Sequence, residues 1–169
     1  MNGAYLELLR AHAPLLMIVT PLAGAALTLV SGSARLSWLI ACAAAGIAAV
    51  IGIDFALAVF SAAPPAIAEV GVALYVDGIG TFAGALIALT LTLVVVSVGA
   101  TLKESGASAA PFSMALILCA AAGWIGALMA RDLAAVFLAV ETAWLAAVGL
   151  TALNAVRARD PKFSVMIRG

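Results

Sequence analysis

One carboxylate stands out in this sequence as a residue able to do chemistry. Glu141 is the one charged residue in the apolar run 133–153. An ionised glutamate at the centre of a bilayer costs ~2.5 kcal/mol or more, and the cost falls when the acid is protonated, paired with a cation or turned toward water. The first two states depend on a proton or a partner charge, so acids of this kind serve in moving charge across membranes. We therefore expect Glu141 to exchange a proton or to form an ion pair.

The element that must position Glu141 is a helix of about 31 Å, at ~1.5 Å for each of its 21 residues. Large apolar residues share the face of the acid: Phe137, Leu138, Trp144, Leu145 and Val148, with Ala134. Small residues at i, i+4 spacing form the opposite ridge: Ala135, Ala139, Ala143, Ala147 and Thr151. Such ridges permit close helix packing. We expect protein to enclose this helix on both sides. The alternative role for Glu141 is structural, as a hydrogen-bonding acid that fixes the helix to a neighbour.

Three further acids are secondary candidates. Asp54 lies near the end of an apolar run, where we expect it to be solvated at the membrane boundary. Asp77 precedes Gly78, and Asp132 precedes the run of Glu141, so each is placed to begin a helix. We expect Asp132 to cap its helix and Asp77 to serve a turn at a helix N-terminus, where an acid is favourable, with a functional role as the alternative for all three.

The composition predicts an integral membrane protein. Of 169 residues, 66% are hydrophobic and 9% are charged, against roughly 45–50% and ~25% in soluble domains. The net charge of zero gives no electrostatic footprint for nucleic acid. The sequence has no Ser/His/Asp set, phosphate-binding loop or Cys/His cluster. We therefore expect no catalytic centre, cofactor or metal in this chain, and packing roles for Cys42 and Cys119.

The chain divides into five runs long enough to span a bilayer as helices, because hydrocarbon leaves the backbone no other partners. The predicted spans are 14–30, 36–60, 79–100, 112–130 and 133–153, followed by a basic tail over 154–169. We predict one all-α membrane domain. The connector 61–78 has room for a short interfacial segment, and Pro111 is placed to open the fourth span.

The basic residues predict the orientation. With five spans, one side of the membrane holds Arg35, Lys103, Arg157, Arg159, Lys162 and Arg168. The other side holds Arg10 and Arg131. The excess of positive charge belongs on the cytoplasmic side. We expect the tail in the cytoplasm and the N-terminus outside.

Two segments resemble the antiporter-like, proton-translocating membrane subunits. "YVDGIGTFAGALIALTLTLVVVSVGA" is similar to the opening of that family's third helix. "ARDLAAVFLAVETAWLAAVGLTAL" looks like its fifth helix, with Asp132 nine residues before Glu141. The family includes proton-pumping subunits of respiratory complex I, Mrp-type sodium/proton antiporter subunits and membrane-bound hydrogenase subunits. The resemblance covers about residues 70 to 154.

The resemblance implies a role for Glu141 in a charge relay along the membrane midplane. In the family this acid pairs with a lysine of a later helix, whereas this chain has five spans against about fourteen. We therefore expect lysine-bearing helices from another chain. The chain is then half of a split subunit or a shortened relative that serves as a scaffold. The resemblance also implies a bacterial inner membrane. It implies a complex driven either by redox chemistry, similar to NADH–quinone oxidoreductase or hydrogenase, or by an opposing ion gradient. A structural membrane subunit without transport is the main alternative, and a small stand-alone carrier is the other.

Overall fold

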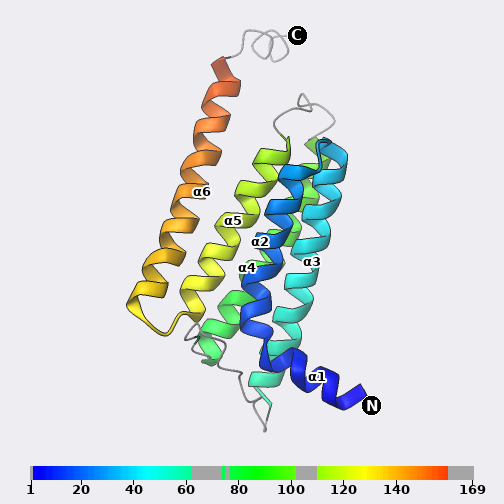
Figure 1. The fold of residues 1–169 in the computed structure, drawn as a ribbon, viewed down its shortest axis with the longest axis vertical. Coiled ribbons are helices and arrows are strands. Elements are labelled where there is room, and N and C mark those ends of the chain that lie inside the picture. The colour runs from blue at the N-terminus through cyan, green and yellow to red at the C-terminus, as the bar shows by residue number, and fades with distance from the viewer. Residues whose placement is uncertain (1, 62–73, 75–76, 102–109, 160–169) are drawn as a thin grey trace.

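The computed structural model describes residues 2–61, 74, 77–101 and 110–159. Six helices make up nearly all of this part of the chain (Figure 1). They are α1 (Asn2–Ala11), α2 (Ala13–Val30), α3 (Ala34–Val59), α4 (Gly78–Thr101), α5 (Ala110–Met129) and α6 (Leu133–Arg159). The prediction of an all-helical chain is confirmed.

Five of these helices, α2 to α6, are long and apolar enough to cross a membrane. Their candidate spans begin and end within two residues of the predicted ones. Pro111 is the second residue of α5, as expected of a helix-opening proline. Helix α6 continues to Arg159, so the first six residues of the predicted basic tail extend the helix. Most of the two longer connectors and the rest of the tail lie outside the described residues.

Helices α2, α3, α4 and α5 form a bundle, and α6 lies against its edge (Figure 1). Helix α5 packs against α2, α3, α4 and α6, which places it at the centre of the fold. Helix α6 packs chiefly on α5. Over its most apolar window only 11% of residues are buried, against 56% for α5. Most of the α6 surface is therefore left open by the described residues.

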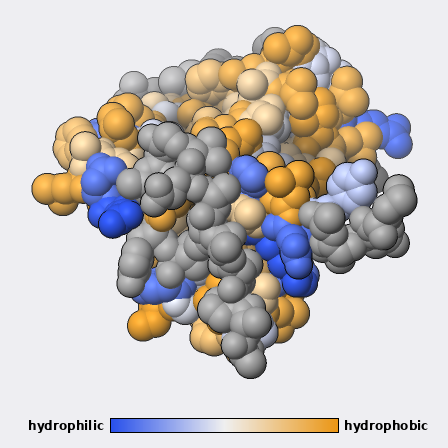
Figure 2. Space-filling view, turned by 60° about the horizontal axis from the view of Figure 1, so that its bottom comes forward, coloured by the Kyte–Doolittle hydropathy of each residue, from blue (hydrophilic) through white to orange (hydrophobic). Residues whose placement is uncertain are grey.

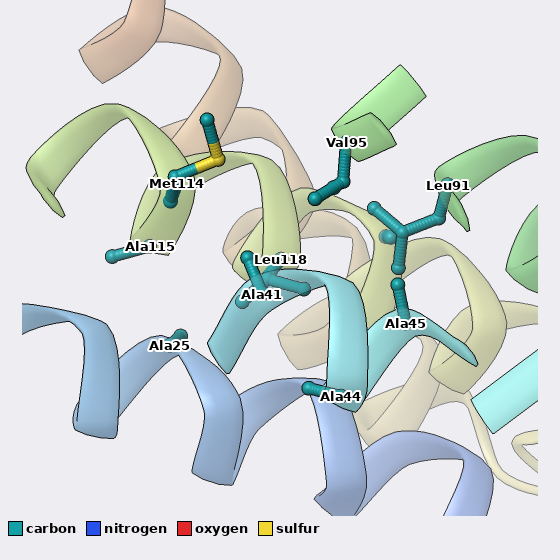
Figure 3. Packing of buried hydrophobic residues seen from close by; sticks show 10 residues of the cluster. Ala25, Ala41, Ala44, Ala45, Leu91, Val95, Met114, Ala115 and Leu118 are labelled. Carbon is teal, nitrogen blue, oxygen red and sulfur yellow. The ribbon is translucent and has the colours of Figure 1, made fainter. Parts of the chain in front are cut away.

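The bundle is close-packed because its interior is built largely from alanine. Figure 3 shows Ala25 of α2 and Ala41, Ala44 and Ala45 of α3 beneath larger residues of α4 and α5. Those larger residues are Leu91, Val95, Met114 and Leu118. Small side chains let two helix backbones approach, and the longer side chains of the facing helices fill the remaining space.

A short turn joins α2 to α3. Gly32 has φ 65°, the left-handed region that suits glycine. Ser33 then caps α3 by accepting a hydrogen bond from the Leu36 amide at 3.2 Å. Ser37 is buried but satisfied, because its hydroxyl bonds to the Ser33 carbonyl at 2.8 Å and to the Ser31 hydroxyl at 2.6 Å. The turn covers residues 31–33, and Ala34 is the first residue of α3.

Candidate functional site

The helix that carries Glu141 begins at Asp132. The Asp132 carboxylate accepts a hydrogen bond from the Ala135 amide at 2.7 Å, and its carbonyl accepts one from Val136 at 3.1 Å. A carboxylate in this position satisfies an amide that the first helical turn leaves free. The expectation that Asp132 caps this helix is confirmed. Helix α6 therefore has a fixed start, and Glu141 lies about 13 Å further along it at ~1.5 Å per residue.

At Gly123, helix α5 approaches the backbone of α6 closely. A Cβ added to Gly123 of α5 would lie 2.6 Å from the Ala139 carbonyl oxygen and 2.6 Å from the Ala143 amide nitrogen. Ala143 and Ala146 are the buried residues of α6. The predicted ridge of small residues packs as expected at Ala139 and Ala143. Its continuation, Ala147 and Thr151, is exposed.

Glu141 lies on the face of α6 opposite this contact. The side chains three and four residues away are all open: Phe137 62%, Leu138 66%, Trp144 64% and Leu145 65% exposed. Glu141 itself is half-buried, because these neighbours flank it along the same helix. Within the part of the chain that the structure describes, Glu141 has no hydrogen bond and no ion pair. No described helix covers the acid, so the expected enclosure on that side is not provided by α2 to α5.

A shallow groove runs beside this face, between α2 and α6. It encloses about 250 Å³ over a floor of small residues, Ala122, Gly123 and Gly126 of α5. Its walls include Leu22 of α2 and the α6 residues Leu138 and Thr142, which flank Glu141 in sequence. Glu141 itself does not line the groove, and Ala135 and Ala139 of its lining belong to the opposite ridge of α6, so the groove lies to one side of the acid.

Asp54, a second acid within a span, forms an ion pair with a basic residue of the same chain. Arg10 of α1 donates from Nε and Nη2 to the two carboxylate oxygens of Asp54 in α3, each at 2.9 Å. Two parallel bonds of this kind fix orientation as well as distance. The hydrogen bonds and the charge of Asp54 raise the pKa of Arg10 from its ordinary value. The sequence led us to expect Asp54 to be solvated at the membrane boundary. It did not lead us to predict helix α1 or the ion pair that α1 forms with Asp54.

Asp77 caps α4. Its carboxylate accepts a hydrogen bond from the Gly80 amide at 2.6 Å, and its carbonyl accepts one from Thr81 at 3.1 Å. The expected position of Asp77 at a helix N-terminus is confirmed, and the hydrogen bond to Gly80 adds a capping role. Asp54, Asp77 and Asp132 thus gather at the end of the bundle that carries α1, whereas Glu141 stands apart within its span. Figure 2 brings that end forward and shows hydrophilic residues among the apolar ones.

The other reactive side chains form no site in the described part of the chain. No group of three His, Cys, Asp or Glu residues there is placed to hold a metal ion. Cys42 and Cys119 are free thiols packed against the core cluster of Figure 3. His12 lies between α1 and α2, with Nδ1 2.9 Å from the Leu8 carbonyl. Of the candidate residues, Glu141 is the one in the middle of a span that has no partner among the residues that the structure describes.

Comparison with protein-family models, with curated proteins and with solved structures found no match to this chain. The main evidence for a function is therefore the position of Glu141 on an open face of α6.

Proposed function

We propose that this chain is a membrane subunit of a multi-chain complex that translocates protons or another cation. Glu141 contributes one carboxylate to a charge relay that a neighbouring chain completes. The observation that carries the proposal is the position of Glu141: within a span, on an uncovered helix face, with no partner among the described residues.

The energetics of the bilayer favour a partner at this face. A lone ionised carboxylate facing lipid is costly, and the described basic side chains cannot relieve the cost for Glu141. Arg10 is paired with Asp54. Arg35 and Arg131 are exposed and lie at the ends of the spans. A proton, contact with water, a bound ion or a cation supplied by another chain would each stabilise the acid. Exchange between the protonated and the ion-paired state is the elementary step of a relay.

The resemblance of 70–154 to antiporter-like subunits supports the same proposal. On the strength of this resemblance, the proposed complex is one similar to complex I, an Mrp antiporter or a membrane-bound hydrogenase, in a bacterial inner membrane. The redox cofactors of such a complex would lie in other subunits. The distribution of Lys and Arg favours an outside N-terminus and a cytoplasmic tail.

The experiment replaces Glu141 with Gln in the complex as it copurifies in mild detergent. Proton uptake is then measured with a pH-sensitive dye in reconstituted vesicles. Glutamine keeps the size of the side chain and some of its hydrogen bonding but cannot ionise. We expect proton uptake to be lost while the partner chains still copurify. Glu7→Gln is the matched control, because Glu7 is an exposed acid of α1 outside the five spans. Full uptake with Glu141→Gln removes Glu141 from the mechanism.

A structural role in assembly is the second candidate, favoured by the open groove between α2 and α6. Here Glu141 serves as a hydrogen-bonding group that holds a neighbouring helix. Glu141→Gln would then leave both transport and assembly nearly unchanged, whereas Glu141→Leu would release the partner chains. Measuring copurification for both variants separates the two functions.

A further inference from the structure

Helix α1 has an apolar side that no described residue covers. Tyr5, Leu8 and Leu9 lie three to four residues apart and so project from one face of the helix. They are 69%, 61% and 43% exposed. Glu7 and Arg10 project from the other side. The short helix is therefore amphipathic, and its polar side is the one that is bound to the bundle, through Asp54.

The ion pair fixes the level of α1 relative to the membrane. Helix α3 has 26 residues and is about 39 Å long, which is longer than the ~30 Å hydrocarbon core. Asp54 lies five residues before the last residue of α3, or about 8 Å from its end at ~1.5 Å per residue. The carboxylate therefore lies near the boundary of the hydrocarbon layer. Because Arg10 reaches it with two bonds of 2.9 Å, α1 is held at that boundary and does not stand free in water.

Figure 1 shows α1 turned away from the direction of the five long helices, at the end where α3 finishes and α4 and α6 begin. The same end holds the caps Asp77 and Asp132. The apolar face of α1 is thus at the same height as the polar ends of the spans. The apolar face of α1 therefore extends outward from the apolar sides of the spans, along the membrane boundary.

We propose that α1 is a membrane-interface helix, whose Tyr5, Leu8 and Leu9 face takes lipid as its partner and whose orientation is fixed by the Arg10–Asp54 ion pair. Helices with an apolar and a charged side lie in the interface with the apolar side buried among the upper acyl segments. Tyrosine is enriched at the same level because its ring is apolar and its hydroxyl is polar. The ion pair keeps Arg10 toward the bundle, so the opposite face meets the surrounding lipid.

Nitroxide labels test the proposal in the full chain. Cys42 and Cys119 are first replaced by Ser, and Tyr5, Glu7 or Leu8 is then replaced by Cys and labelled. The protein is reconstituted in vesicles of phosphatidylethanolamine and phosphatidylglycerol. Collision rates with oxygen, which concentrates in lipid, and with a water-soluble nickel chelate report the surroundings of each label. We expect a several-fold higher oxygen-to-nickel ratio at positions 5 and 8 than at position 7.

Arg10→Gln tests the role of the ion pair. Without it α1 is free to turn, so we expect the difference between positions 8 and 7 to disappear. The double variant Arg10→Asp with Asp54→Arg should restore it. Equal access of nickel at all three positions would show that α1 stands in water, and shielding of positions 5 and 8 from both reagents would show that protein covers the face. Either result overturns the lipid assignment. A difference that survives Arg10→Gln overturns the role of the ion pair.

Discussion

Replacing Gly123 with Ala tests the contact that holds α6, and with it Glu141, against the bundle. The new Cβ would lie 2.6 Å from two backbone atoms of α6, whereas ordinary contacts begin at 3.4 Å. Backbone atoms in the middle of a helix cannot turn aside as a side-chain tip can. The two helices must therefore part by about 0.8 Å, the difference between these distances.

Two opposing effects determine how much Gly123→Ala changes the free energy of unfolding. Overpacking of a close-packed contact costs about 1–3 kcal/mol. Alanine in place of a helical glycine stabilises by roughly 0.5–1 kcal/mol. We therefore expect Gly123→Ala to lower the free energy of unfolding by up to about 2.5 kcal/mol. Gly46→Ala is the matched control, because a Cβ there meets nothing within 4 Å, and it should be neutral or stabilising.

The assay is unfolding in mixed micelles, followed by a thiol-reactive dye. Cys42 and Cys119 are free and partly buried, so they react faster as the bundle opens. Gly149→Ala provides an intermediate case, since its Cβ would meet the Leu116 side chain at 3.2 Å and that side chain can move. Equal midpoints for the Gly123 and Gly46 variants would refute the backbone contact between α5 and α6.

Two further variants test contacts elsewhere in the bundle. The Trp38 indole donates a hydrogen bond to the Val95 carbonyl at 2.9 Å, so Trp38→Phe should lower the free energy of unfolding by about 0.5–1.5 kcal/mol in the same assay. An unchanged midpoint would contradict this. Asp132→Ala removes the cap of α6 and should cost about 0.5–2 kcal/mol, whereas Asp132→Asn, which keeps an acceptor oxygen, should cost little. Equal losses for both Asp132 variants would mean that the carboxylate serves another purpose.

The five spans were predictable because the bilayer sets both the length and the composition of a crossing helix. An apolar run bounded by turn residues, such as Ser31, Gly32 and Ser33 before α3, leaves little choice of limits. The caps Asp77 and Asp132 were predictable for a local reason. A carboxylate placed just before a helix needs only the three residues that follow it to find an amide.

Helix α1 and its ion pair were not predictable by the same reasoning. The segment 2–11 is too short and too polar to register as a span. Its amphipathic face, Tyr5, Leu8 and Leu9, was the available signal, and it was not used. Arg10 and Asp54 are 44 residues apart in sequence. Their pairing depends on how α2 and α3 pack, which periodicity within one helix does not specify.

The side of α6 that packs against another helix could be predicted from the sequence, but the residues that make the contact could not. The ridge of small residues gave the side that approaches another helix, but alanine is so frequent in this sequence that the limits of the ridge could not be read from it. Contact with Gly123 of α5 decides that Ala139 and Ala143 are the residues that pack. Once those two residues face α5, helical periodicity turns Glu141 away from the bundle.

Asp54 and Glu141, the two acids within spans, differ in whether the described part of the chain supplies a cation to pair with them. Asp54 lies near the membrane boundary, where a short flanking helix can bring Arg10 to it without placing a second charge in the hydrocarbon. Glu141 lies about 13 Å beyond the start of its helix, out of reach of Arg131 at that start. Under the proposed function, a helix of another chain that crosses the membrane beside α6 would carry the cation for Glu141. The face that would receive such a helix is the one that α5, by binding the opposite side of α6, leaves open.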